Sequence, residues 1–268
     1  MEIEGKVFVV TGGGNGIGRE VVLGLLDRGA RVAAVDLSAE RLAGTVSLAG
    51  PNTARLTTHE VNVTDLDAVN ALPQAVVDAH GTVDGLLNVA GIIQRFVPFA
   101  ELESSDIQRV MNVNFWGVVN MVRAFLPLLV QRPKAALVNV SSMGGFLPVP
   151  GQTVYGASKA AVKLLTEGLH AELMHGPVAV TVVFPGAIGT NIAQNSGVEI
   201  PGMDAADAAS HKTLPPAEAA RIIIEGMAKG KYRVLVGSDA TLLDRLVRLA
   251  PERAMNLIAK QMADLLRH

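Results

Sequence analysis

A glycine-rich segment between a short apolar run and a helical pattern constrains the fold of this chain more than any other feature. The apolar run, residues 6–10, is rich in β-branched side chains, which is typical of a buried parallel strand. Residues 11–18 follow at once with the sequence TGGGNGIG, and a helical pattern then covers residues 19–28. Glycines permit a tight turn against a bound phosphate, and the N-terminus of the next helix offers N–H groups to an anion. This order predicts a dinucleotide-binding unit, with a flexible turn as the alternative.

The next expected strand, residues 31–36, ends in an acidic residue, Asp36. It lies at the distance from the glycines at which a carboxylate accepts hydrogen bonds from an adenosine ribose. A carboxylate there repels a 2′-phosphate, and no Arg or Lys stands at residues 13–17 or at Leu37 to offset the repulsion. We therefore expect NAD as the cofactor, with NADP less favoured. The alternative is that Asp36 only caps the helix that begins near Ser38.

Strand and helix patterns then alternate along most of the chain. Expected strands cover residues 54–61, 83–88, 136–140, 178–184 and 233–236, and expected helices cover 38–48, 65–79, 104–130 and 152–175. The helix over residues 104–130 is expected to bend before Pro127. Repeated strand–helix units predict an α/β fold of the doubly wound Rossmann type, with a parallel sheet and helices on both faces. No internal repeat or low-complexity linker divides the chain, so we expect a single domain over residues 1–237.

Tyr155 and Lys159 are four residues apart in one of these expected helices, so their side chains share a face. A phenol has a pKa of about 10, and a neighbouring ammonium favours the phenolate and lowers that pKa. The pair therefore predicts a proton donor and acceptor for an alcohol–ketone conversion. Ser142, at the end of the preceding expected strand, could hold the reacting oxygen. Taken alone the pair is a weak signal, because an ordinary helix with a surface lysine shows the same spacing.

Composition argues against several other classes of protein. The net charge of −2 gives no indication of the basic surface that nucleic-acid binding requires. The absence of cysteine excludes disulfides and thiolate chemistry. The histidines form no ligand-spaced pair, so no metal is expected. The N-terminus is acidic and lacks the apolar stretch of a signal peptide, and the apolar run 115–130 is too short and too polar to span a membrane. We expect a cytoplasmic protein.

The order of these motifs resembles that of the classical short-chain dehydrogenase/reductase (SDR) family, from about residue 6 to residue 236. The resemblance implies a seven-stranded sheet of order 3-2-1-4-5-6-7 and a nicotinamide-dependent oxidoreductase acting on CH–OH groups. The catalytic set that it implies is Asn114, Ser142, Tyr155 and Lys159, with a water held at the Asn114 kink as part of a proton relay. The cofactor-binding positions that it implies are Gly12, Gly14, Asn15, Gly16, Ile17, Gly18, Asp36, Leu37, Asn62, Val63, Asn88, Ala90, Gly91, Tyr155, Lys159, Pro185, Gly186, Ile188 and Thr190.

Two positions depart from the family pattern. Asn62 stands where an aspartate is commoner near the adenine, and its amide can still pair with that base. Val89 replaces the second asparagine of the Asn-Asn-Ala-Gly motif, which removes a polar group that usually braces the loop. We expect some loss of rigidity and intact chemistry, because the four implied catalytic residues are all present.

The substrate end of the site is expected to be mostly apolar. Candidate substrate contacts are Ser142, Gln94, Met143, Gln152 and Tyr155, and none is an Arg or Lys that would clamp a carboxylate or phosphate. The sequence therefore predicts a neutral, fairly lipophilic secondary alcohol or ketone as substrate. Residues 191–216 mix glycine, alanine and polar residues without a clean period, which indicates a substrate lid or an ordinary connecting loop.

The tail, residues 238–268, has two amphipathic patterns, over 239–249 and 251–267. Three interpretations remain open: packing on the same domain or a neighbouring subunit, a lid over the pocket, or contact with a membrane surface. The family resemblance implies a homodimer or homotetramer built on the helices over 104–130 and 152–175.

Two other functions compete with the enzyme. A non-catalytic NAD-binding regulatory or scaffold protein has no physical need for the complete set Asn114, Ser142, Tyr155 and Lys159. A nucleotide-sugar epimerase-like enzyme would need basic residues for a diphosphate, which the expected pocket lacks.

Overall fold

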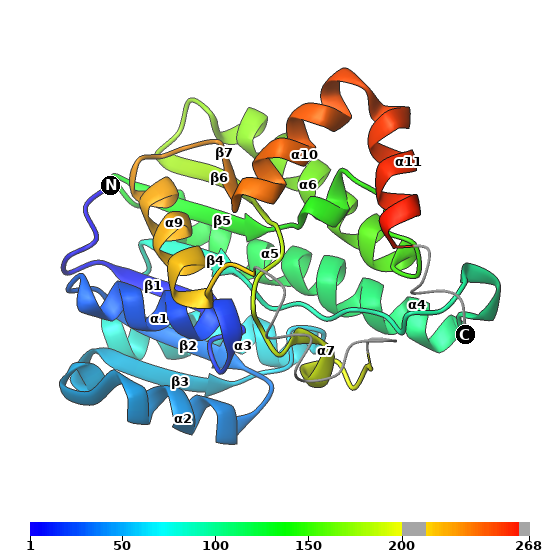
Figure 1. Ribbon diagram of the computed structural model, residues 1–268. Helices are drawn as coiled ribbons and strands as arrows, with labels where there is room; N and C mark the ends of the chain where they lie inside the picture. The colour runs from blue at the N-terminus through cyan, green and yellow to red at the C-terminus, as the bar shows by residue number, and fades with distance from the viewer. Residues whose placement is uncertain (200–212, 263–268) are drawn as a thin grey trace.

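Seven parallel strands form one sheet in the order β3-β2-β1-β4-β5-β6-β7, as predicted (Figure 1). The computed structural model describes residues 1–199 and 213–262. The strands are β1 (Val7–Thr11), β2 (Arg31–Asp36), β3 (Leu56–Glu60), β4 (Gly85–Asn88), β5 (Ala135–Val140), β6 (Val178–Pro185) and β7 (Arg233–Val236). The helices are α1 (Gly16–Asp27), α2 (Ala39–Ala49), α3 (Leu66–His80), α4 (Ser104–Met111), α5 (Gly117–Leu129), α6 (Thr153–Leu173), α7 (Ile192–Asn195), α9 (Pro216–Ala228), α10 (Ser238–Leu249) and α11 (Pro251–Gln261). Shorter helical segments are η1 (Gly50–Arg55), η2 (Phe99–Glu101), η3 (Asn112–Trp116) and η4 (Met143–Gly145).

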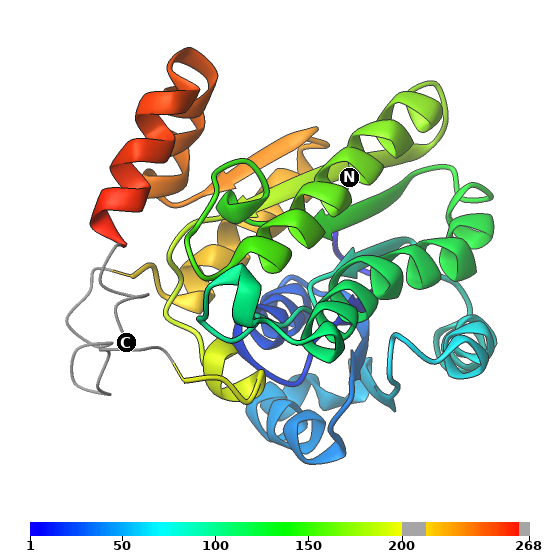
Figure 2. The same ribbon diagram turned by 90° about the vertical axis from the view of Figure 1, so that its right-hand side faces the viewer.

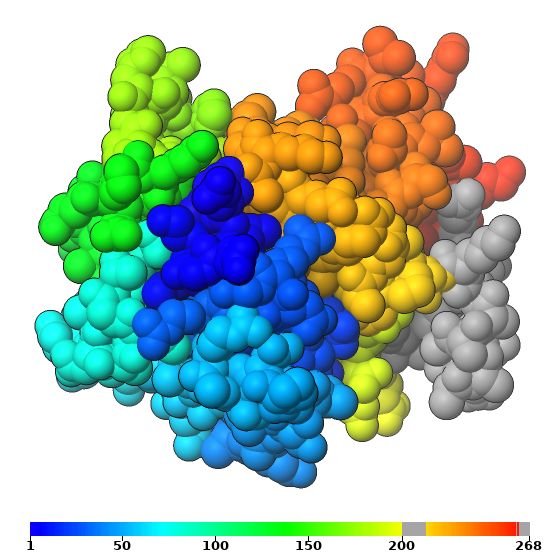
Figure 3. Space-filling view, turned by 90° about the vertical axis from the view of Figure 1, so that its left-hand side faces the viewer, coloured from blue at the N-terminus to red at the C-terminus, as the bar shows by residue number. Residues whose placement is uncertain are grey.

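Helices cover both faces of the sheet, which explains why the central strands are mostly apolar and buried on both sides. Every residue of β1, β4 and β5 is buried. Residues of α1, α2 and α9 form one apolar core with one face of the sheet, and residues of α3, α5 and α6 form a second core on the other face. The N-terminal segment lies against α9, where the Met1 amino group donates a hydrogen bond to the Ala228 carbonyl (Figure 3).

The register of the sheet brings the predicted site residues to one edge. Thr11 lies opposite both Val35 and Asn88, and Asn88 lies opposite Asn139. The glycine loop after β1, the acidic end of β2 and the loop after β5 therefore meet at the carboxyl ends of neighbouring strands. In open parallel sheets this is the edge at which ligands bind.

The long helix expected over residues 104–130 is present as three consecutive helical segments over Ser104–Leu129. The structure has two helices, α4 and α5, joined by the π-helical segment η3. Pro127 lies within α5 without ending it, and the bend expected before it stays a prediction. The irregularity lies at Asn114, whose side chain bonds both the N–H and the C=O of Ile92. The kink at Asn114 that the family resemblance implies therefore coincides with a π-helical segment bonded to a distant loop.

The tail packs on the loop that follows β5. Ala254 and Ile258 of α11 form an apolar cluster with Leu147, and Asp244 of α10 pairs with Arg233 of β7. Figure 2 shows α10 and α11 at the opposite end of the molecule from α2. The expected lid falls partly on residues 200–212 and the expected tail helix partly on residues 263–268, which lie outside the described residues.

Within residues 1–199 and 213–262, no helix has both the length and the apolar character needed to cross a membrane. In the same part of the chain, no group of His, Asp and Glu side chains could hold a metal ion.

Candidate active site

The glycine loop between β1 and α1 has the shape that a dinucleotide phosphate requires. Gly12 and Gly16 adopt φ values of +70° and +52°, which side-chain-bearing residues rarely adopt. A Cβ on Gly18 would lie 2.1 Å from the Gly12 carbonyl oxygen, so only glycine lets α1 begin this close to the loop. The Asn15 side chain caps α1 by accepting a hydrogen bond from the Gly16 N–H at 2.7 Å. The remaining N–H groups in the first turn of α1 and the positive end of the helix dipole suit an anion.

Asp36 lies at the end of β2, next to this loop. One carboxylate oxygen accepts the Gly14 N–H at 3.0 Å and the other accepts the Ser38 N–H at 3.1 Å. Helix α2 is capped by Ser38, whose hydroxyl accepts the Arg41 N–H at 3.2 Å. The alternative that Asp36 is the helix cap is therefore wrong. Its carboxylate is held by the glycine loop itself.

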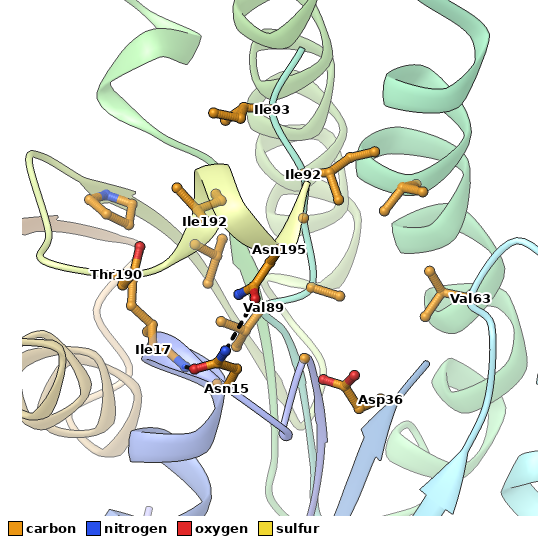
Figure 4. Close-up of a pocket in the computed structure, with 18 of the residues that line it drawn as sticks. Asn15, Ile17, Asp36, Val63, Val89, Ile92, Ile93, Thr190, Ile192 and Asn195 are labelled. Atoms are coloured by element: carbon orange, nitrogen blue, oxygen red, sulfur yellow. Dashed lines mark hydrogen bonds between the residues drawn. The ribbon is translucent and has the colours of Figure 1, made fainter. Parts of the chain in front are cut away.

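A cavity of about 330 Å³ extends from Asp36 past the glycine loop to Tyr155 (Figure 4). The predicted cofactor positions that line it are Gly12, Asn15, Gly16, Ile17, Gly18, Asp36, Leu37, Asn62, Val63, Ala90, Gly91, Tyr155, Lys159, Pro185, Gly186, Ile188 and Thr190. Figure 4 shows Asp36 and Val63 on one side of this cavity and Ile93 at the far end. The cavity thus joins the predicted nucleotide end to the predicted catalytic end.

Ser142, Tyr155 and Lys159 line the same end of the cavity. Burial raises the pKa of the Tyr155 phenol, and a side-chain hydrogen bond with Ser142 partly opposes that rise. The Lys159 ammonium lies 6.0 Å from the Tyr155 ring centroid and donates a hydrogen bond to the Val140 carbonyl at 3.0 Å. Burial lowers the pKa of Lys159 to about 8. The net direction of the Tyr155 pKa is therefore upward, opposite to the lowering expected from Lys159, because desolvation is the largest cause of the shift.

The profile of the short chain dehydrogenase family matches residues 6–200. The chain belongs to this family. The resemblance in the order of its motifs is thereby confirmed, and this SDR is an oxidoreductase acting on CH–OH groups.

Relatives and solved structures extend the match over nearly the whole SDR chain. The Mycobacterium tuberculosis protein SadH, provisionally named an oxidoreductase, is 38% identical over 273 residues, covering 97% of this chain and 96% of SadH. A Burkholderia phymatum SDR in complex with NAD is 29% identical with a TM-score of 0.82, covering 93% of this chain and 96% of that one. A Burkholderia cenocepacia short chain dehydrogenase in complex with NADP is 30% identical with a TM-score of 0.80, covering 96% and 99%.

Two predicted cofactor contacts of this SDR do not line the cavity. Gly14 holds Asp36 through its N–H. Asn88 is buried between strands, where its Nδ2 donates to Asn139 Oδ1 at 2.9 Å. Asn139 in turn donates to the Thr166 hydroxyl of α6 at 3.0 Å. Asn88 therefore joins β4 to β5 and, through Asn139, to α6, and its role as a cofactor contact stays a prediction.

Asn114 is fully buried behind the catalytic end. Its Oδ1 accepts the Ile92 N–H at 2.8 Å, and its Nδ2 donates to the Ile92 carbonyl at 2.9 Å and to Ser158 Oγ at 3.0 Å. Asn114 thus holds the loop after β4 against α6. The proton relay through a water at this position stays a prediction.

The predicted substrate contacts divide into two groups. Ser142 and Tyr155 line the cavity, whereas Gln94, Met143 and Gln152 do not. Gln94 is fully buried and Gln152 nearly so, and both are hydrogen-bonded to the protein backbone. The amide donor groups of both glutamines are thus used within the fold, and their role as substrate contacts stays a prediction.

Several lining residues escaped the sequence reasoning. The cavity is also lined by the apolar side chains of Ile92, Val113 and Ile192. At the nucleotide end, Arg41 lies beside Asp36, since a Cβ on Gly14 would lie 2.7 Å from Arg41 Cβ and 2.8 Å from Asp36 Cγ. Asn195 of α7 accepts a hydrogen bond from Asn15 Nδ2 at 3.2 Å and so brings α7 against the glycine loop (Figure 4). The sequence could have indicated Arg41 as a lining residue, because it stands in the first turn of the helix that follows Asp36.

Proposed function

We propose that this SDR is an NAD-dependent oxidoreductase that interconverts a neutral, fairly lipophilic secondary alcohol and its ketone. One observation carries the proposal: Ser142, Tyr155 and Lys159 meet at one end of a cavity whose other end holds the glycine loop and Asp36.

The residues present fit a nicotinamide dinucleotide. The loop from Gly12 to Gly18 leaves the room that a Cβ would fill, and the N-terminus of α1 suits a pyrophosphate. Asp36 would accept hydrogen bonds from the adenosine ribose, and Thr190 with the Ile188 backbone would hold the carboxamide. When bound, the cofactor supplies or accepts the hydride.

The protein supplies the proton and the polar contacts. Because burial raises the pKa of Tyr155, the phenol keeps its proton at neutral pH and can donate it to a ketone oxygen during reduction. Ser142, hydrogen-bonded to the same phenol, stabilises charge on the reacting oxygen. Lys159 is a buried cation one helical turn away and favours the phenolate that forms as the proton leaves. Oxidation of the alcohol reverses these roles and requires the deprotonated phenol.

The substrate class rests on the apolar lining near Tyr155. Ile92, Ile93 and Ile192 line the cavity (Figure 4), whereas Arg41 lies beside Asp36 at the nucleotide end. Among the described lining residues, the remaining cation is Lys159, whose ammonium already bonds the Val140 carbonyl. A substrate carboxylate or phosphate would enter this end without a described basic partner, which is unfavourable.

Turnover, followed by the absorbance of the reduced nicotinamide, tests this proposal directly. Secondary alcohols and their ketones of increasing size and polarity are assayed with both cofactors, and we expect kcat/KM to rise with apolar bulk. A clear preference for a charged sugar acid over uncharged ketones would contradict the substrate class. Tight NAD binding without turnover on any alcohol or ketone would favour the non-catalytic binding protein instead.

Asp36→Ala is expected to shift the cofactor preference toward NADP by about 10–100-fold, measured as the ratio of the two kcat/KM values. The substitution removes the charge that repels a 2′-phosphate and leaves Arg41 beside the vacated place. Asp36→Ala combined with Arg41→Ala is the matched control and should lose the gain in NADP use. An unchanged NAD/NADP ratio in Asp36→Ala would exclude Asp36 as the selecting residue.

A further inference from the structure

The helix that carries Tyr155 begins without a cap of its own. Gln152 is the residue before α6, and its side chain makes no capping hydrogen bond. The first N–H groups of a helix have no partner within the helix, and a cap residue normally supplies one. Val154 and Tyr155 are the second and third residues of α6, so their N–H groups need acceptors from elsewhere.

Gln94 supplies these acceptors from the loop after β4. Its Oε1 accepts the Val154 N–H at 2.8 Å and the Tyr155 N–H at 3.0 Å. Its Nε2 donates to the Gly151 carbonyl at 2.8 Å, just before the helix. The side chain is 0% exposed, so water cannot replace these bonds without opening the site.

Gln94 is itself held from both sides. Gln152 Nε2 donates to the Gln94 backbone carbonyl at 2.8 Å, so the two glutamines tie the loop and the helix start to each other. Two residues earlier, Ile92 is bonded to Asn114 through both its N–H and its C=O. The loop between these points lines the cavity with Ile92 and Ile93, and Figure 4 shows Ile93 at the far end.

We propose that Gln94 is a positioning residue, which fixes the first turn of α6 and thereby holds the Tyr155 hydroxyl against Ser142. This role rests on the proposed function in one respect: it takes Tyr155 as the proton donor. Gln94 does not touch the cavity, so its effect on the reaction passes through the backbone of Tyr155. Catalytic geometry is sensitive to such support, because a misplacement of about 1 Å can cost about 100-fold in rate.

Gln94→Met tests the proposal with little change of shape, since it keeps the side-chain length and removes both the acceptor and the donor. The matched control is Asp65→Ala on α3. The Asp65 carboxylate accepts two helix N–H groups, those of Asp67 at 3.0 Å and Ala68 at 3.1 Å, so the control removes an equivalent cap far from Tyr155. If Gln94→Met does not fold, Gln94→Asn is used instead, because its side chain keeps the amide but is one methylene shorter.

Titration of Tyr155 gives a readout that needs no substrate. The chain has two tyrosines, so Tyr232→Phe leaves Tyr155 as the only phenol, and its ionisation is followed by tyrosinate absorbance. In this background we expect the pKa of Tyr155 to lie above its ordinary value because of burial. Gln94→Met should bring that pKa down toward about 10, because a frayed first turn admits water to the phenol. Asp65→Ala should leave it in place.

Turnover is measured on the best substrate of the alcohol and ketone panel. We expect Gln94→Met to lower kcat at least about 10-fold with the NAD dissociation constant within about threefold, and Asp65→Ala to keep kcat within about twofold. Equal kcat and an unmoved Tyr155 titration in Gln94→Met would overturn the proposal. A moved titration in an enzyme that turns over no substrate would count against the proposed function and leave the positioning role supported.

Discussion

Tyr155→Phe is expected to lower kcat by about 10²–10⁴-fold while leaving the NAD dissociation constant within about threefold. The ring stays and only the hydroxyl that exchanges the proton with substrate is lost, so cofactor contacts made by the surrounding cavity persist. The change is measured by absorbance of the reduced nicotinamide, with calorimetric titration of NAD. Tyr232→Phe is the matched control: it removes the other tyrosine hydroxyl of the chain, on an exposed ring outside the cavity, and should keep kcat. A Tyr155→Phe enzyme with kcat within about threefold of wild type would exclude the phenol as proton donor.

The pH dependence of the wild type follows from the direction of the tyrosine pKa. Burial raises that pKa above its ordinary value, so the phenol is protonated at neutral pH. It loses its proton, and with it the ability to act as an acid, only at alkaline pH. Ketone reduction should therefore be flat near neutral pH and fall at alkaline pH, whereas alcohol oxidation should rise as pH increases. Initial rates in both directions over a pH series give the comparison. An oxidation rate that falls steadily above neutral pH, in an enzyme that remains folded, would contradict this assignment.

Lys159→Met is expected to change activity and stability in opposite directions. The ammonium favours the phenolate and faces the cofactor cavity, so its loss should lower kcat/KM by about 10²-fold or more. Its burial depresses the pKa from 10.5 to about 8, so the charged form destabilises the folded chain at neutral pH. The difference between these two pKa values corresponds to about 3 kcal/mol in the free energy of unfolding. Loss of the hydrogen bond to Val140 offsets about 1 kcal/mol of it. We therefore expect Lys159→Met to raise the free energy of unfolding by about 2 kcal/mol.

The stability gain should depend on pH in a defined window. Between about pH 8 and pH 10.5 the unfolded wild type binds more protons at Lys159 than the folded one, so wild-type stability rises with pH there. The advantage of Lys159→Met should be constant below about pH 8, fall as pH rises, and reverse by about pH 10.5 to a deficit of about 1 kcal/mol from the lost hydrogen bond. Chemical denaturation at several pH values measures it. Lys163→Met is the matched control on the same helix: it removes a partly exposed lysine paired with Glu167 at 2.9 Å and should bring no gain. A Lys159→Met protein less stable than wild type at pH 7 would refute the buried-charge argument.

The strand and helix succession and the glycine loop could be predicted because they rest on local patterns. Period and composition identify the buried strands, and the spacing of Gly12, Gly16 and Gly18 reflects steric limits within one turn. The side chains of Tyr155 and Lys159 share a helical face by their spacing alone, and both do line one end of the cavity. The parallel sheet then places the ends of β1, β2 and β5 at one edge, which follows from strand direction.

The partners of polar side chains could not be predicted in the same way. Gln94 and Gln152 look like substrate contacts in sequence, but the fold places a helix start and a backbone carbonyl within reach of their amides. Asn114 lies in the π-helical segment η3 and bonds Ile92, a partner far away in the chain that the residues around Asn114 do not identify. Arg41 becomes relevant to cofactor choice only because the turn of α2 brings it beside Asp36.

The sequence by itself determined the fold class, the family and the identity of the chemical groups, because each depends on the order and spacing of nearby residues. Only the tertiary structure decided which of those groups face the cavity and which are used as internal supports. The physical reason is that a buried amide bonds whichever backbone group lies within about 3 Å, and that group can be far away in the chain. The acceptor of Gln94 lies 60 residues before the Val154 N–H that it caps. The direction of the Tyr155 pKa likewise follows its burial, which is a property of the whole fold and is not set by the spacing to Lys159.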